Sequence, residues 1–322
     1  MKRWWMLGGF VLALSGTALV GAQTIAGAAG LSSYERMSGI AGNLSSVGSD
    51  TLNNLMTYWS EGFAKIYPSV HVQVEGKGSA TAPPALIAGA SQLGPMSRPM
   101  KSSEIDAFEK KYGYKPTAIA VALDALAVYV NKDNPIQHLN IAQVDAIFSG
   151  TRSCGGSTDV VNWAQLGLGG EWSHPISLYG RNSASGTYAY FKERALCKGD
   201  YKSSVKEQPG SATVVEGVSN DRYAIGYSGM GYKTAGVRIV PLSGLGSATV
   251  YEATQDNVYA GTYPISRYLY IYINRAPGQP VDPLVKQFLL YVISEEGQQA
   301  VVKDRFVPLV KEIAQTEMKK LE

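Results

Sequence analysis

Histidine and cysteine are both scarce in this chain of 322 residues, which has three histidines and two cysteines. Zinc sites need several such ligands at close spacing, and none of His71, His138 and His174 has a cysteine or a second histidine at that spacing. The sequence therefore predicts no metal site and no metal cofactor. Charge is also sparse and balanced, with 29 Lys and Arg against 26 Asp and Glu. This balance argues against nucleic acid as a partner, because nucleic-acid binding relies on a basic excess.

Long apolar runs are absent beyond the N-terminal region, so no later segment is expected to span a membrane. The N-terminal run from Trp4 to Val20 is itself short for a span, follows Lys2 and Arg3, and ends at small residues. This pattern is typical of a secretory signal. We therefore expect residues 1–22 to be a signal peptide and the mature protein to be soluble and periplasmic. The signal region contains no cysteine, which leaves no thiol for a lipid anchor.

The two cysteines, Cys154 and Cys197, are an even count for an exported chain. Thiols in an oxidising compartment tend to pair, and we expect a disulfide between these two. Closing a loop of this length would stabilise the folded state by roughly 3–4 kcal/mol in the chain-entropy description.

Residues 181–187 combine an arginine, two nearby hydroxyls and a glycine at the point where a helix is expected to begin. The sequence of this segment is Arg-Asn-Ser-Ala-Ser-Gly-Thr. A guanidinium offers five donors in a rigid fork that matches tetrahedral oxyanions, and the first free N–H groups of a helix add further donors. The segment therefore predicts a site for a small oxyanion. Taken alone, it fits an ordinary helix N-cap equally well.

Segments with helical apolar spacing alternate along the chain with short β-branched runs. Such alternation predicts an α/β fold whose turns gather at one edge of the sheet. Residues 102–111 are expected to form a helix capped at Ser102 or Ser103. The other predicted helices cover residues 52–66, 84–90, 141–148, 188–196, 283–293 and the segments after Gly210 and Glu295. The predicted strands cover 70–74, 118–130, 176–179, 224–227 and 268–273, and a short apolar piece lies at 93–96.

A mature chain of about 300 residues exceeds what one hydrophobic core usually holds, which predicts two lobes. No low-complexity linker separates them, so continuous secondary structure should join them. Residues 118–130 and 268–273 are long apolar strands suited to that crossing. We expect a discontinuous first lobe at residues 35–120 plus 265–322, and a second lobe at residues 121–264.

Four turns share small and hydroxyl-bearing residues, and three of them directly precede predicted helices. Each turn alone fits a helix N-cap. Their joint occurrence after strands of both lobes favours a ligand site, because ligands of open α/β sheets lie where strands end and helices begin. The turns are Gly48-Ser49-Asp50-Thr51, Gly78-Ser79-Ala80-Thr81, Gly94-Pro95-Met96-Ser97-Arg98 and residues 181–187.

This ordered set resembles the periplasmic phosphate-binding proteins of high-affinity phosphate ABC transporters. The motifs that carry the resemblance, which covers nearly the whole mature chain, lie at residues 48–51, 78–79, 97–98, 181–187 and 263–267. The resemblance implies a hinged, two-lobed α/β architecture of the type II periplasmic binding fold, with one dehydrated phosphate in the cleft between the lobes. It also implies a monomer that serves a membrane permease driven by a separate ATPase. The phosphate-binding residues that it implies are Ser49, Asp50, Thr51, Ser79, Ser97, Arg181, Ser185, Gly186 and Thr187.

Some members of that family have an aspartate where this chain has Ser97. An acceptor carboxylate favours phosphate, which keeps a proton near neutral pH, over sulfate, which does not. Another acid should then take this role, and we expect it to be Asp50, with Asp124 as the second candidate. Two alternatives stay open: Asp124 as the structural partner of Arg98 or Arg267, and Asp50 as a helix N-cap.

Other functions fit the sequence less well. Ser185 does not stand in a Gly-x-Ser-x-Gly elbow and no histidine is evident as its base, and no His/Asp ligand set suggests metal-dependent phosphatase chemistry. A secreted phosphatase is therefore not expected. Binding of sulfate or molybdate remains an alternative, against which Asp50 and Asp124 both count. The chain has no Gly-x-x-x-x-Gly-Lys-Ser/Thr loop, so we do not expect it to use ATP itself.

Overall fold

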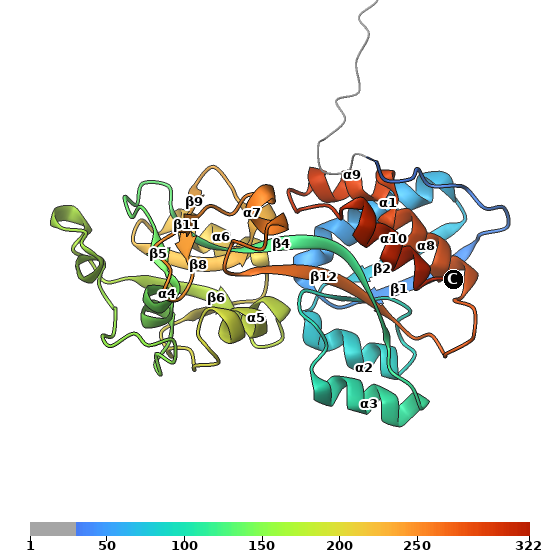
Figure 1. The fold of residues 1–322 in the computed structure, drawn as a ribbon, viewed down its shortest axis with the longest axis horizontal. Helices are drawn as coiled ribbons and strands as arrows, with labels where there is room; N and C mark the ends of the chain where they lie inside the picture. The colour runs from blue at the N-terminus through green and yellow to red at the C-terminus, as the bar shows by residue number, and fades with distance from the viewer. Residues whose placement is uncertain (1–29) are drawn as a thin grey trace, which may run out of the picture.

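The computed structural model describes residues 30–322 and shows two lobes side by side (Figure 1). The predicted signal peptide, residues 1–22, lies outside the described residues. Two long strands, β4 (Thr117–Asn131) and β12 (Ser266–Ile273), run between the lobes. Helices cover sheets in both lobes, so the predicted two-lobed α/β architecture is confirmed. The exact lobe boundaries, drawn at residues 120/121 and 264/265, stay predictions.

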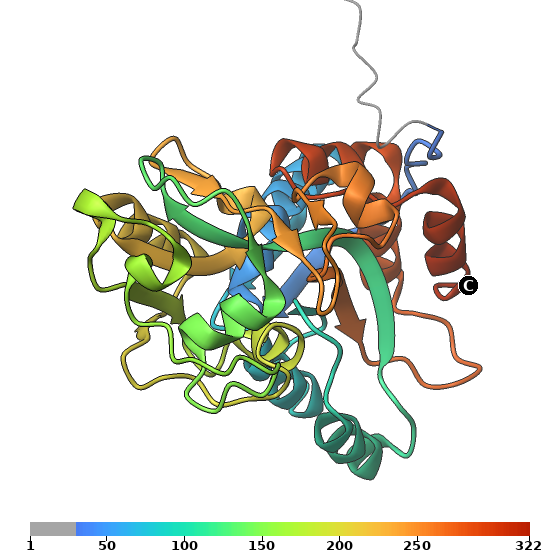
Figure 2. The same ribbon diagram turned by 60° about the vertical axis from the view of Figure 1, so that its left-hand side comes forward.

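The strand β4 belongs to the sheets of both lobes. Its first part, from Thr117 to Ala125, pairs antiparallel with β12. Its later residues pair antiparallel with β8 (Ala224–Gly229) and β9 (Val237–Ile239). Nearly every residue of β4 is buried, which explains why the sequence is continuously apolar rather than alternating. Figure 2 shows this long curved strand passing from one lobe to the other.

The first lobe contains the N-terminal and C-terminal elements. Its strands β1 and β2 pair in parallel, and β3 pairs antiparallel with β12. The apolar face of α1, which includes Trp59 and Phe63, is fully buried, as the helical spacing predicts. The elements are β1 (Gly42–Val47), α1 (Asn53–Ile66), β2 (Val70–Glu75), α2 (Ala82–Ile87), β3 (Gly94–Met96), α3 (Ser102–Tyr112), α8 (Pro283–Ile293), α9 (Glu295–Lys303) and α10 (Lys311–Lys319), with single-turn 3₁₀ helices at Asp50–Leu52 and Ser79–Thr81.

The second lobe is built on the far half of β4. The strand order continues from β4 through β8 and β6 to β7, and β6 is parallel to both of its neighbours. A smaller sheet joins β5, β10 and β11. The remaining elements are β5 (Leu139–Asn140), α4 (Ile141–Phe148), β6 (Ser177–Arg181), α5 (Gly186–Arg194), β7 (Lys206–Gln208), α6 (Ser211–Asn220), β10 (Leu242–Ser243), β11 (Val250–Tyr251) and α7 (Gln255–Tyr259), with 3₁₀ turns at Trp163–Leu166, Gly170–Trp172 and Met230–Tyr232.

The start of α3 differs from the prediction. The helix begins at Ser102 and its N-cap is Lys101, so the expectation that Ser102 or Ser103 caps it is wrong. The carboxylate of Glu104 accepts a hydrogen bond from the Lys101 N–H at 2.8 Å, which satisfies a donor at the helix start without a serine. The same carboxylate receives two hydrogen bonds of 2.7 Å from Arg98.

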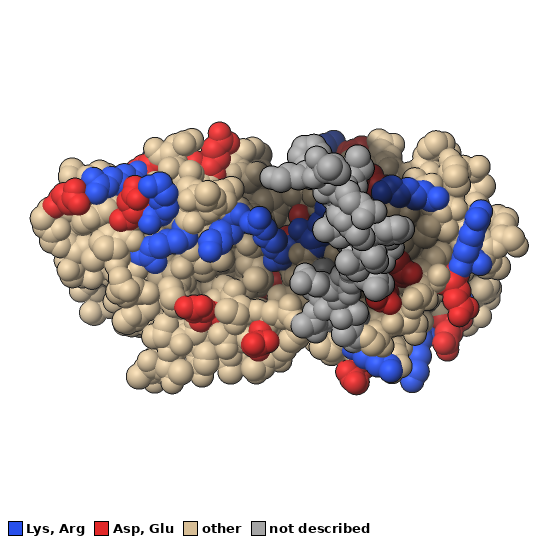
Figure 3. All heavy atoms as spheres, turned by 90° about the horizontal axis from the view of Figure 1, so that it is seen from above, with Lys and Arg blue, Asp and Glu red and all other residues tan. Residues whose placement is uncertain are grey.

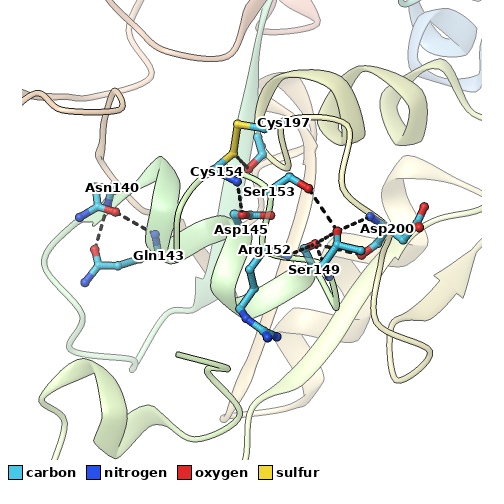
Figure 4. Close-up of a disulfide and its surroundings, with 11 residues drawn as sticks. Asn140, Gln143, Asp145, Ser149, Arg152, Ser153, Cys154, Cys197 and Asp200 are labelled. Atoms are coloured by element: carbon cyan, nitrogen blue, oxygen red, sulfur yellow. Dashed lines mark hydrogen bonds between the residues drawn. A yellow bond between two sulfur atoms is a disulfide. The ribbon is translucent and has the colours of Figure 1, made fainter. Parts of the chain in front are cut away.

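The predicted disulfide between Cys154 and Cys197 is confirmed (Figure 4). The two Cα atoms are 5.3 Å apart. Cys154 lies in the loop after α4, where its N–H donates to the Asp145 carboxylate at 2.7 Å, and Cys197 lies just beyond the end of α5. The bond therefore fastens the C-terminal end of α5 to the loop that follows α4.

No helix within residues 30–322 has both the length and the apolar character needed to cross a membrane.

Candidate functional site

The four hydroxyl-rich turns meet where the two lobes face each other. The turn after β1 reaches α5 through Thr51, whose Oγ1 lies 2.9 Å from Thr187 Oγ1. The turn after β2 reaches the loop before α5, because the Ala80 N–H donates to the Ala184 carbonyl at 3.0 Å. Segments about 100 residues apart in the chain thus form one cluster, as their shared position after strands predicts.

Six hydroxyls of this cluster are buried. A buried hydroxyl needs a hydrogen-bond partner, since leaving it unpaired costs about 1–3 kcal/mol. The exposed fraction is at most 3% for each of Ser49, Thr51, Ser79, Ser97, Ser185 and Thr187.

The backbone of Gly186 lies close to two hydroxyls of the first lobe. Ser79 Oγ accepts a hydrogen bond from the Ser97 N–H at 3.0 Å, and the two serine hydroxyls are 3.2 Å apart. A Cβ atom on Gly186 would lie 2.3 Å from Ser79 Oγ and 2.6 Å from Ser97 Oγ. Only glycine fits here without displacing both hydroxyls, so the residue type of Gly186 is set by contact across the cleft.

The N-terminus of α5 points its free donors into the same cluster. The helix begins at Gly186, two residues earlier than predicted, with Ser185 as its N-cap. Ser185 Oγ accepts hydrogen bonds from the N–H groups of Thr187 at 3.1 Å and Tyr188 at 3.4 Å. The helix-cap interpretation of this segment is therefore correct for Ser185. It leaves the hydroxyl hydrogen available to a ligand, next to the positive end of the helix dipole.

Arg181, the last residue of β6, is almost completely buried, with 1% of its surface exposed. Its Nη1 donates to Ser211 Oγ at 2.6 Å and its Nη2 donates to the Pro209 carbonyl at 3.0 Å. Burial lowers the pKa of Arg181, and the nearby Asp50 carboxylate opposes this shift; the guanidinium stays charged at any physiological pH. Its buried Nε has no hydrogen-bond partner within residues 30–322, so one donor remains for a ligand.

Asp50 crosses from the first lobe to the second. Its Oδ2 lies 3.1 Å from Arg181 Nη1 and accepts a hydrogen bond from the Ser211 N–H, at the start of α6, at 2.8 Å. The Tyr232 hydroxyl donates to the Asp50 carbonyl at 3.0 Å. Asp50 is predicted to accept a hydrogen bond from the proton that phosphate carries, and this role stays a prediction. Ser211 and Tyr232 are not among the predicted site residues, although the Gly-Ser-x-Thr turn at 210–213 carries the same signal as the other turns.

Asp124 is fully buried and forms an ion pair with Arg267. Its Oδ2 accepts hydrogen bonds from Arg267 Nε at 3.0 Å and Nη2 at 2.7 Å, and its Oδ1 accepts one from the Met230 N–H at 3.1 Å. Desolvation raises the pKa of the Asp124 carboxyl, while the charge and hydrogen bonds of Arg267 oppose that rise. Both oxygens already have protein donors, so of the two acids Asp50 is the better candidate to accept a ligand proton. Arg98, the other suggested partner, pairs with Glu104 instead.

The chemistry of the cluster is dominated by donors. It offers hydroxyls, helix N–H groups and the guanidinium of Arg181, and Asp50 places a carboxylate beside that guanidinium. No group of three or more potential metal ligands occurs within residues 30–322. Seen from above, Lys and Arg side chains form a row along one lobe that leads toward the middle of the molecule (Figure 3). This arrangement suits a small anion with several acceptor oxygens.

A profile of the PBP superfamily domain matches residues 35–296. The phosphate-binding protein PstS of Pseudomonas aeruginosa is 57% identical over 292 residues, which cover 90% of each chain. The chain belongs to the PstS family of the PBP superfamily. The family that the sequence motifs predict is therefore confirmed.

Other proteins share this architecture at lower identity. Protein SphX of Synechococcus elongatus is 30% identical over 81% of this chain and 76% of its own length. A crystal structure of a phosphate ABC transporter substrate-binding protein with bound phosphate, from Clostridium perfringens, matches with a TM-score of 0.71 and 25% identity, over 84% of this chain and all of the other. An ABC-type phosphate transport receptor from Vibrio cholerae shares the fold with a TM-score of 0.63 and 21% identity, over 83% of this chain and 100% of its own. The fold described above is thus shared with these solved structures.

Proposed function

We propose that the chain binds inorganic phosphate between its lobes and delivers it to the permease of a phosphate ABC transporter. The observation that carries the proposal is the buried meeting of donors from both lobes around Arg181, whose Nε has no partner within the described residues. Membership of the PstS family supports phosphate as the ligand. The predicted phosphate-binding residues of both lobes lie in or beside this cluster. We place the mature protein in the periplasm as a soluble monomer, with the ATPase as a separate protein.

Binding rather than catalysis is the function that we infer. Ser185 Oγ accepts hydrogen bonds from two backbone N–H groups of its own helix. Its hydrogen-bond partners among residues 30–322 do not include a histidine or carboxylate that could act as its base. Phosphate would instead touch both lobes and favour the closed arrangement by the difference between its affinities for the closed and open forms. The closed form would then be the one presented to the permease.

Thermal melting with three anions tests the proposed ligand. Phosphate and arsenate are expected to raise the melting temperature by about 5 °C or more at concentrations near 1,000 times Kd, because saturation then adds about 4 kcal/mol to the free energy of unfolding. Sulfate at the same concentration and ionic strength should cause no specific shift. An equal shift with sulfate or molybdate would instead indicate the alternative oxyanion function, and no shift with any anion would refute the proposal.

The variant Asp50→Asn tests the choice between phosphate and sulfate. Loss of the acceptor carboxylate beside Arg181 is expected to weaken phosphate binding about tenfold and to narrow its preference over sulfate, since an amide can donate to a fully deprotonated anion. Calorimetry with both anions at several pH values would measure this. Asp256→Asn is the matched control, because Asp256 also stands in the first turn of a helix, α7, but is exposed. An unchanged preference for phosphate over sulfate in Asp50→Asn would show that Asp50 does not accept the hydrogen bond from the phosphate proton.

A further inference from the structure

We propose that Arg267 is a positioning residue for anion binding, which holds the Thr187 hydroxyl in place once the lobes have closed. Arg267 Nη2 donates to Thr187 Oγ1 at 3.0 Å, and its Nη1 donates to the Ser97 carbonyl at 2.8 Å. One guanidinium thus contacts a predicted ligand residue of each lobe. This inference rests on the proposed function and assigns a role in it to a residue outside the predicted site.

The guanidinium is anchored on the strands that join the lobes. Arg267 of β12 and Asp124 of β4 are direct partners across the antiparallel ladder, and their side chains are 1% and 0% exposed. The Tyr190 ring faces the guanidinium, with its centroid 5.6 Å from Arg267 Cζ, which adds a cation–π contact. The pairing with Asp124 therefore fixes Arg267 on the linking strands, while Tyr190 contacts it from α5 of the second lobe.

The contact with Thr187 differs in kind from the others. Ser97 directly follows β3, which pairs with β12, so the contacts of Arg267 with Asp124 and Ser97 belong to one continuous sheet. Thr187 lies on α5, which belongs to the second lobe. Separation of the lobes would move Thr187, together with Tyr190 of the same helix, away from Arg267 and leave the contacts with Asp124 and Ser97 in place. Arg267 therefore stabilises the closed form, and with it the bound anion, through this hydrogen bond and the Tyr190 contact, of which the hydrogen bond alone holds a predicted ligand residue.

The direction of the hydrogen bonds gives Arg267 a second effect. A guanidinium only donates, whereas a hydroxyl has one hydrogen and two acceptor positions. Arg267 thus occupies one acceptor position of Thr187, and the 2.9 Å contact between Thr187 and Thr51 uses one of their two hydrogens. Whichever of the two donates, one hydrogen remains for the ligand. The hydroxyls of Thr51 and Thr187 are therefore arranged to donate a hydrogen bond to the ligand, as an oxyanion requires.

A double-mutant cycle measures this role. Arg267→Lys keeps a positive charge beside Asp124 but removes the fork that reaches Thr187, and we expect it to raise the Kd for inorganic phosphate about tenfold. The ligand-free melting temperature, measured in parallel, reports any purely structural effect. In a Thr187→Val background the same replacement should change Kd less than about twofold, because the contact is already absent. Equal effects of Arg267→Lys in both backgrounds, or an unchanged Kd in the first, would overturn the inference.

The matched control is Arg238→Lys. Arg238 also donates to backbone carbonyls, those of Asn134 and Ile136, but it does so on β9 within the second lobe. We expect its Kd for phosphate to equal that of the wild type. Absence of phosphate binding by the wild type itself would refute the proposed function and this role of Arg267 together, whereas wild-type binding with an unaffected Arg267→Lys variant would refute the role alone.

Asp124→Asn provides an independent variant if Arg267→Lys does not fold. The amide keeps the volume of the carboxyl but holds the guanidinium less firmly, so Kd for phosphate should rise about fivefold with unchanged preference over sulfate. An unchanged Kd would contradict the anchoring of Arg267. A loss of preference over sulfate would show instead that Asp124 accepts the ligand proton and would also count against the inference.

Discussion

Replacement of Arg181 by alanine is expected to weaken phosphate binding by at least about 100-fold. The side chain is buried and contacts Ser211, Pro209 and Asp50, and its Nε is left for the ligand. Hydrogen bonds to a charged group contribute about 1.5–3 kcal/mol each, and removal of the guanidinium also leaves Asp50 without its cation next to an anion. A loss of about 3 kcal/mol corresponds to roughly a 100-fold change in Kd.

Isothermal calorimetry with phosphate measures the effect of Arg181→Ala. Circular dichroism of the ligand-free variant shows whether the second lobe remains folded. Arg181→Lys should be intermediate, since it restores the charge but not the fork. In the double variant Arg181→Ala, Asp50→Asn part of the lost affinity should return, because the unpaired carboxylate is gone. A folded Arg181→Ala protein with a Kd within threefold of the wild type would exclude Arg181 as the principal anion ligand.

Gly186→Ala should weaken phosphate binding by about 100-fold while changing the ligand-free protein little. The added Cβ would occupy the space of the Ser79 and Ser97 hydroxyls, at 2.3 Å and 2.6 Å. Either the lobes stay apart or both hydroxyls turn away, and each outcome removes donors worth about 1.5–3 kcal/mol to an anion. Alanine itself suits a helix better than glycine, so α5 should not be destabilised.

Calorimetry and small-angle X-ray scattering together test Gly186→Ala. Scattering should show that saturating phosphate no longer compacts the variant as it does the wild type. Gly169→Ala is the control, because a Cβ atom at Gly169 would have no neighbour within 4 Å among the residues that the structure describes. The φ of Gly169, −94°, is also open to any residue. Wild-type affinity in Gly186→Ala would show that the lobes do not close as tightly around the ligand as the structure has them.

Most of the fold could be predicted because burial leaves a periodic signature. The fully buried β4 is a long apolar run, and α1 repeats its buried residues at helical spacing. By contrast, β1 is missing from the predicted strands. Its sequence Gly-Asn-Leu-Ser-Ser-Val is mostly polar, and it forms a strand because it pairs in parallel with β2. A strand that depends on its neighbour has little signature of its own.

Part of the site could be predicted for a different reason. The turns at Ser49, Ser79, Ser97 and residues 181–187 each carry small polar residues at the end of a strand, and fold topology brings such ends together. Arg267 ends the motif at residues 263–267 that carries the family resemblance, but that motif does not predict a contact with the ligand cluster. It is the second residue of β12, and its link to Thr187 depends on a contact across 80 residues of sequence. Only the structure shows that its guanidinium reaches the cluster.

The paired strands β4 and β12 determine how the two halves of the molecule can move. Their ladder extends from the pair Thr117–Ile273 to the pair Ala125–Ser266. Its register shifts once, between Leu269 and Tyr270. A two-stranded ribbon bends out of its plane more easily than it stretches or shears, because bending keeps its hydrogen bonds while sliding breaks them. We therefore expect the lobes to move mainly by bending of this ribbon. The facing surfaces of the two lobes would then meet in the same alignment each time the lobes close.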